Sequence, residues 1–259
     1  MKEKILKELA GVENRHNVKI ILACESGSRA WGFPSMDSDY DVRFIYVHQM
    51  DWYLSIAKRK DVIELPLDKV LDINGWDLHK SLQLMRKSNS PLMEWLRSPI
   101  RYRVWPEALD LLMDLSQKAF LPETSCHHYL AMAKTSLDKF INTTEIKAKL
   151  YMYVVRSLLC CQWIVSNMTP PPVQFEDLME KTVEDLSFKN TILDLIRKKE
   201  KKTESFHVKR IDMIDDFIHE KLQALPQRIP KNPSKTTMKR EIECFDDVFR
   251  SILRSNTLF

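Results

Sequence analysis

The stretch GSRAWGFPSMDSDYDVRF, residues 27–44, decides the predicted fold. It holds two of the chain's four glycines, and its aspartates stand at alternate positions, 37, 39 and 41. The apolar run VKIILAC (18–24) precedes it, and YDVRFIYV (40–47) closes it, so both are predicted strands. The Gly/Ser/Pro-containing segment 26–38 between them is predicted to be a loop.

The residue types in this loop indicate phosphate chemistry. Asp39 and Asp41 are two positions apart, so in a strand their side chains project from the same face. Two carboxylates at such a short distance repel each other, and a divalent cation, Mg²⁺ or Mn²⁺, removes the repulsion. Gly27 lets the backbone approach a phosphate, to which the Ser28 hydroxyl can donate. Together these features favour phosphoryl or nucleotidyl transfer.

The blocks GSRAWG and SDYDVR resemble the Gly-Ser…Asp-h-Asp signature of the DNA polymerase β-like nucleotidyltransferase superfamily. Within it they are most similar to the RNA-repair-pathway polymerase-β-like family, as are segments 73–102 and 147–164. The resemblance implies an α+β fold, a mixed sheet with flanking helices followed by a helical domain. It also implies two-metal transfer of a nucleoside monophosphate from ATP or another NTP. Ser28 would hold the terminal phosphates, and Asp39 and Asp41 the metals.

Two-metal sites usually need a third carboxylate. The superfamily places it on a later strand, where Asp72 of KVLDIN is flanked by the apolar residues Leu71 and Ile73. Asp72 is therefore the favoured third ligand and catalytic residue. Asp77, in the first turn of a predicted helix, and Glu64, on an adjacent predicted strand, are the alternatives.

A second group of polar residues lies farther along the chain. Lys149, Tyr153 and Arg156 have the spacing i, i+4, i+7 and share one face of an otherwise apolar helix. They are predicted to contact the NTP, with Tyr153 under the base or ribose. In the alternative interpretation the two cations extend to solvent and Tyr153 packs in the core. Arg29 and Lys80 are further candidates for phosphate contact, although each taken alone reads more readily as a surface or structural charge. The charge run 197–202 is expected to be a solvated face.

The pattern of elements predicts two domains, a nucleotidyltransferase catalytic domain at 1–105 and a helical domain at 106–259. Two further strands are expected at 61–66 and 68–74. Ser90 is the expected N-cap of a short helix that begins with Pro91. The other predicted helices cover 3–16, 76–88, 106–118, 123–142, 144–168, 187–202, 207–224 and 237–256.

Composition excludes several classes of protein. The 259 residues are 44% apolar, which allows a sizeable core, and the net charge is only +4. The five cysteines include no CxxC pair, so zinc binding and a disulfide framework are not expected, and buried free thiols are. No signal peptide or apolar run of about 20 residues is present. We expect a cytoplasmic protein with no membrane partner.

The sequence therefore predicts a Mg²⁺-dependent nucleotidyltransferase that uses an NTP. Its acceptor hydroxyl would belong to an RNA end, as in RNA repair, to a protein side chain or to a small molecule. The alternative is a non-catalytic, antitoxin-like module that keeps the fold to bind a nucleotide or a partner. The complete set Gly27, Ser28, Asp39 and Asp41 favours the enzyme.

Overall fold

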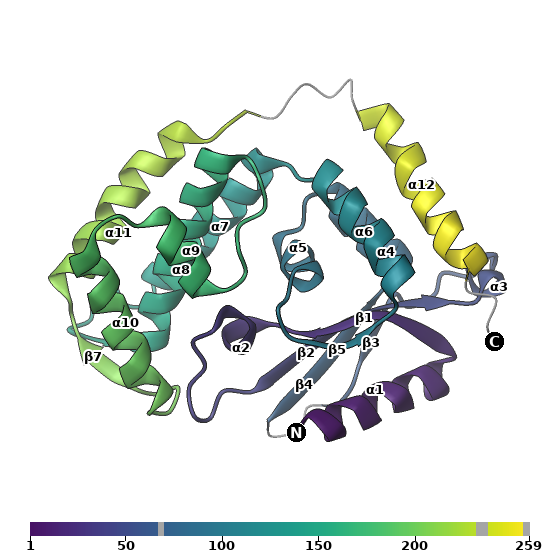
Figure 1. Ribbon diagram of the computed structural model, residues 1–259, viewed down its shortest axis with the longest axis horizontal. Coiled ribbons are helices and arrows are strands. Elements are labelled where there is room, and N and C mark those ends of the chain that lie inside the picture. The colour runs from purple at the N-terminus through teal and green to yellow at the C-terminus, as the bar shows by residue number, and fades with distance from the viewer. Residues whose placement is uncertain (67–69, 232–237, 256–259) are drawn as a thin grey trace. The chain divides into compact units, whose positions relative to one another are not determined.

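The computed structural model describes residues 1–66, 70–231 and 238–255. The chain forms two compact units, each with its own secondary-structure elements (Figure 1). The first unit consists of Met1–Gly27, Asp39–Phe120 and Pro233–Phe259, and the second of Ser28–Ser38 and Leu121–Asn232. The chain thus passes between the units four times, which differs from the predicted single boundary after residue 105.

A five-stranded mixed sheet, in the order β3-β4-β2-β1-β5, forms the centre of the first unit (Figure 1). Its strands are β1 (Val18–Glu25), β2 (Tyr40–His48), β3 (Val62–Glu64), β4 (Leu71–Asp77) and β5 (Arg101–Val104). β2 runs parallel to β4, and all other neighbours are antiparallel. The mixed sheet confirms the predicted α+β class. The strand expected at 68–74 begins at Leu71, and residues 68 and 69 lie outside the described part.

Helices cover both faces of this sheet (Figure 1). They are α1 (Lys2–His16) on one face and α4 (Leu78–Arg86), α5 (Ser90–Leu96) and α6 (Pro106–Lys118) on the other. α12 (Met238–Ser255) packs on α4 and α6, and the short helix α3 (Met50–Tyr53) follows β2. Ile5 and Leu9 of α1 pack against Phe44 on one face. On the other face Ile45 belongs to a larger core with α4, α5, α6 and α12. The alternation of Phe44 and Ile45 between two cores explains why β2 is apolar at consecutive positions.

Two helices differ from the sequence-based expectation. α6 and α12 contribute apolar side chains, among them Leu112 and Ile252, to the core of the first unit rather than to a separate helical domain. α5 begins one residue earlier than predicted, because Asn89 is its N-cap. The Asn89 side chain accepts a hydrogen bond from the Leu92 N–H at 3.0 Å.

The second unit is mainly helical (Figure 1). Its elements are α2 (Gly27–Trp31), α7 (Pro122–Leu137), β6 (Glu145–Lys147), α8 (Ala148–Asn167), α9 (Phe175–Thr182), α10 (Leu186–Glu200), β7 (His207–Lys209), α11 (Asp212–Ala224) and the 3-10 turn η1 (Leu225–Arg228). α8 is its central helix, because it packs against α7, α9, α10 and α11. The predicted helices at 144–168 and 207–224 each begin later, since their first residues pair as strands β6 and β7.

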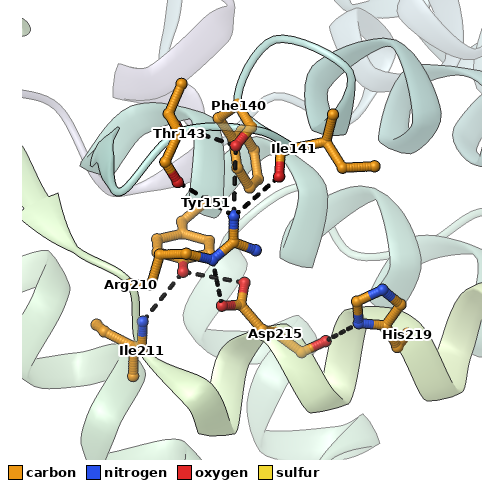
Figure 2. Close-up of polar contacts among 8 residues, drawn as sticks. All are labelled: Phe140, Ile141, Thr143, Tyr151, Arg210, Ile211, Asp215 and His219. Carbon is orange, nitrogen blue, oxygen red and sulfur yellow. Dashed lines mark hydrogen bonds and ion pairs between the residues drawn. The ribbon is translucent and has the colours of Figure 1, made fainter.

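A polar cluster joins α11 to α8 and to the end of α7 (Figure 2). Arg210 pairs with Asp215 at 2.9 Å and donates to three backbone carbonyls after α7, those of Phe140, Ile141 and Thr143. The Tyr151 hydroxyl of α8 donates to Asp215 Oδ1 at 3.0 Å and accepts from the Ile211 N–H at 3.1 Å. The cluster therefore fixes the start of α11 on the central helix.

All five cysteines are free thiols. Four of them, Cys24, Cys126, Cys160 and Cys161, are buried as expected, whereas Cys244 of α12 is exposed. Among the residues that the structure describes, no helix is both long and apolar enough to cross a lipid bilayer.

Candidate active site

Gly27 follows β1 and lies against the carboxylate of Asp41. Its φ of +61° lies in the left-handed region, which a residue with a side chain rarely adopts. A Cβ atom at this position would lie 2.4 Å from Asp41 Oδ2. The Ser26 N–H also donates to the Asp41 carbonyl at 2.8 Å. Glycine is therefore required here both by the backbone conformation and by the close approach of Asp41.

Glu25, the last residue of β1, holds the backbone of Asp41 from the other side. Its Oε1 accepts the Asp41 N–H at 2.8 Å, and its Oε2 accepts the Tyr102 hydroxyl. The Ser98 hydroxyl donates to the Glu25 carbonyl at 2.7 Å. Glu25 is only 1% exposed. Glu25 is not among the residues predicted for the site, although a carboxylate at the end of a mostly apolar strand was the available signal.

Asp41 and Asp72 lie directly opposite each other in the parallel pair β2–β4. Arg43, two residues after Asp41, joins them through one nitrogen. Its Nη2 lies 3.0 Å from Asp41 Oδ1 and 2.7 Å from Asp72 Oδ2. This role of Arg43 cannot be predicted from the sequence, because the pairing of β2 with β4 cannot be read from local periodicity.

The other two candidates for the third carboxylate have structural partners. Asp77 caps α4 by accepting the His79 N–H at 2.8 Å, and it accepts the Tyr53 hydroxyl at 2.7 Å. Burial raises the pKa of Asp77 to about 6. Glu64 accepts a hydrogen bond from the Asn74 side chain at 2.9 Å. Of the three, only Asp72 is opposite Asp41 in the register.

Asp39 lies one residue before β2 and is exposed. Within residues 1–66, 70–231 and 238–255, no group of three or more His, Cys, Asp or Glu side chains is arranged to hold a metal ion. The predicted trio of Asp39, Asp41 and Asp72 therefore stays a prediction. The pair Asp41–Asp72 does fit Mg²⁺ in one respect. That ion commonly binds one or two carboxylates and completes its coordination with water and substrate phosphates.

In the second unit, Ser28 is the start of a chain of hydrogen bonds. The Ser28 hydroxyl donates to Ser38 Oγ at 3.3 Å, and Ser38 Oγ in turn donates to Glu204 Oε1 at 3.0 Å. Glu204 also forms an ion pair with Lys149. The predicted phosphate ligands Ser28 and Lys149 are thus linked through Glu204. This residue was missed because it lies 166 positions after Ser38 in the chain.

The remaining predicted ligands pack around the same loop. The Tyr153 ring meets Trp31 edge-on, with centroids 5.4 Å apart. The Arg156 guanidinium lies 4.2 Å from the centroid of Trp31 and is 1% exposed. The structure thus places Arg156 in the core beneath Trp31, and not on an open polar surface. Arg29 donates to the Ser38 carbonyl at 2.6 Å, which closes the loop.

Lys199 corrects the interpretation of the charge run 197–202 as a solvated face. Its side chain is 2% exposed, and its Nζ donates to the Phe33 carbonyl at 2.7 Å and to Ser35 Oγ at 2.8 Å. Burial lowers the pKa of Lys199 to about 8. Lys199 of α10 therefore anchors the loop Ser28–Ser38. Because it stands within a run of charged residues, the sequence does not distinguish it from its neighbours.

The chain is similar in sequence or fold to several known proteins. The model of the RNA repair pathway DNA polymerase beta family matches residues 1–251. The uncharacterized protein YcgL of Bacillus subtilis (strain 168) is 45% identical over 225 residues, which cover 87% of this chain and 86% of that protein. A crystal structure of a nucleotidyltransferase-like protein from Exiguobacterium sibiricum 255-15 matches 98% of this chain and 81% of its own. Its identity is 9% and its TM-score 0.29.

Proposed function

Because the chain belongs to the RNA repair pathway DNA polymerase beta family, we propose that it transfers a nucleoside monophosphate from an NTP to an acceptor hydroxyl. One observation carries the proposal. The carboxylates of Asp41 and Asp72 lie opposite each other across β2 and β4, and the Asp41 carboxylate lies against Gly27, where an added Cβ would displace it. This is a pair of oxygen ligands at a fixed position, which nucleotidyl transfer requires.

Asp41 and Asp72 would hold the divalent cation, Mg²⁺ or Mn²⁺, with Asp39 as a further ligand. When bound, the cation would neutralise negative charge on the reacting phosphates. Asp72 also serves as the group that positions the acceptor hydroxyl and helps to remove its proton. The buried carboxylate of Glu25 keeps the backbone of Asp41 in place and so fixes the direction of its side chain.

The Gly-Ser loop would hold the terminal phosphates. Ser28 follows Gly27 directly. Its hydroxyl would donate to a phosphate oxygen in place of the hydrogen bond that it now donates to Ser38. Lys149 would leave its ion pair with Glu204 and bring its positive charge to the triphosphate. Arg156 would act on the nucleotide indirectly, because its guanidinium supports Trp31 within the loop. Tyr153 packs on the edge of the same tryptophan.

The acceptor is proposed only as a class, an RNA end, a protein side chain or a small molecule. The test is incubation with each of the four α-labelled NTPs and Mg²⁺ or Mn²⁺, with defined RNA, total RNA or lysate proteins as acceptors. We expect label in one acceptor class and release of pyrophosphate. Binding of an NTP without transfer under every condition would instead support a non-catalytic nucleotide-binding module.

The decisive variant is Asp41→Asn. Since a metal contributes several kcal/mol of transition-state stabilisation, we expect transfer to fall at least about a thousandfold while the fold is kept. Asp61→Asn is the matched control. Asp61 lies in the same unit, half-exposed, and pairs with Lys80 at 3.0 Å. Its carbonyl accepts the Asp77 N–H at 2.9 Å, at the opposite end of β4 from Asp72. Normal turnover in a folded Asp41→Asn protein would rule out the proposed metal site.

A further inference from the structure

Arg43 is held at the carboxylate pair by the backbone as well as by the carboxylates. Its Nη1 donates to the carbonyls of Val42 at 3.1 Å and of Asp72 at 3.2 Å. Its Nη2 bridges the carboxylates of Asp41 and Asp72, at 3.0 and 2.7 Å. The two backbone bonds do not use either carboxylate. The guanidinium can therefore keep its place when the carboxylates turn to another cation.

The arrangement has an electrostatic reason. Like charges directly opposite each other on neighbouring strands destabilise a sheet. Asp41 and Asp72 are such a pair, and each is only about one-third exposed, at 35% and 36%. An arginine stays protonated in proteins at any ordinary pH, so Arg43 removes the repulsion permanently. The pair and its arginine together carry one net negative charge.

We propose that Arg43 is a built-in countercharge. It makes the Asp41–Asp72 pair a weak site for a free divalent cation and a strong site for a cation that arrives with a nucleoside triphosphate. A free dication is attracted to the site by one net negative charge. A dication bound to a triphosphate is held in addition by the negative charges and oxygen ligands of the triphosphate. The proposal rests on the proposed function, and it names Arg43 as the positioning residue that sets the order of binding.

The test measures metal binding rather than catalysis. Mn²⁺ is titrated into the full-length protein, and free Mn²⁺ is followed by electron paramagnetic resonance, with and without a non-hydrolysable NTP analogue. For the wild type we expect weak binding of Mn²⁺ alone and much tighter binding with the analogue. Arg43→Met should bind Mn²⁺ alone at least about tenfold more tightly than the wild type, because one positive charge next to the ligands is gone.

Three controls make the result specific. Arg43→Lys keeps the charge and should bind Mn²⁺ alone as weakly as the wild type. The double variant Asp41→Asn/Arg43→Met should lose the tenfold gain, which locates the gain at this pair. Lys80→Met removes a cation that pairs with Asp61 elsewhere in the unit and should leave Mn²⁺ binding unchanged.

An unchanged or weaker affinity of Arg43→Met for Mn²⁺ alone would overturn the proposal. Should Arg43→Met fail to fold without metal, the proposal requires that millimolar Mn²⁺ restore its fold, and failure to do so overturns it as well. The proposed function is tested separately. If the wild type with Mn²⁺ binds no NTP analogue, that function fails, while the two affinities for Mn²⁺ alone still decide the role of Arg43.

Discussion

Gly27 is the residue at which backbone conformation and site geometry coincide. We expect Gly27→Ala to destabilise the fold by about 1–3 kcal/mol through its positive φ, and in addition to displace the Asp41 carboxylate. Urea unfolding measures the first effect and label transfer the second. Gly32→Ala is the matched control, because Gly32 also has a positive φ, +89°, but no atom lies within 4 Å of its added Cβ. Equal activity in the two variants would contradict the close approach.

Lys199 gives the second residue-scale prediction, a dependence of stability on pH. Burial lowers its pKa to about 8 in the folded protein, from 10.5 in an exposed lysine. Between these values the unfolded chain binds more protons than the native one, so the contribution of Lys199 to the unfolding free energy rises with pH. Relative to Lys199→Met, the wild type should gain about 2–3 kcal/mol between pH 7 and pH 10.

Urea unfolding of both proteins at several pH values checks this prediction. Lys198→Met is the control, since Lys198 is exposed and pairs with Asp194 on the surface of α10. A constant difference between the wild type and Lys199→Met across this range would show that Lys199 does not titrate there.

At the scale of elements, the Tyr151 hydroxyl is the contact that links α8 to α11 (Figure 2). Tyr151→Phe leaves the Ile211 N–H and the Asp215 carboxylate without this partner. We expect a loss of about 1–3 kcal/mol in the unfolding free energy of the second unit. His219→Ala, on the exposed side of α11, should cost less than about 0.5 kcal/mol. Equal losses in the two variants would contradict this role.

The elements also show how far sequence reasoning reaches. The strands at 18–24 and 40–47 were predicted because most of their residues are apolar, and β1 and the second half of β2 are indeed buried. The helix predicted from Trp76 begins at Leu78, because Trp76 and Asp77 continue β4. Helical periodicity could not separate a strand end from the first turn that follows it.

The residues of the candidate site also fall into two groups, those that the sequence could predict and those that it could not. The Gly-Ser turn and the aspartates were visible because they are close in sequence and chemically unusual beside apolar strands. Glu204 and Lys199 act on the loop Ser28–Ser38 from more than 160 residues away, and Arg43 acts through the pairing of β2 with β4. Such contacts depend on tertiary structure, which no local pattern encodes.

At the scale of the whole molecule, α12 belongs to the first unit although the whole second unit precedes it in the chain. Phe245, Ile252 and Leu253 are at most 8% exposed, and α12 packs against α4 and α6. A chain ending at residue 232 should therefore lose about 4.5–9 kcal/mol of stability in the first unit, at roughly 1.5–3 kcal/mol for each of these three buried side chains. Urea unfolding followed by the tryptophans measures this loss. Unchanged stability would mean that α12 is dispensable.

This placement of α12 has a consequence for how the protein is made. α12 begins 120 residues after α6 ends. At about 5–20 residues per second, a ribosome needs roughly 6–24 seconds to make that stretch. During this time the apolar surface of α4 and α6 that α12 will cover is exposed to other nascent chains. Completion of the first unit thus waits for the synthesis of the second, and a cell that makes this protein quickly should need a chaperone to protect the unfinished core.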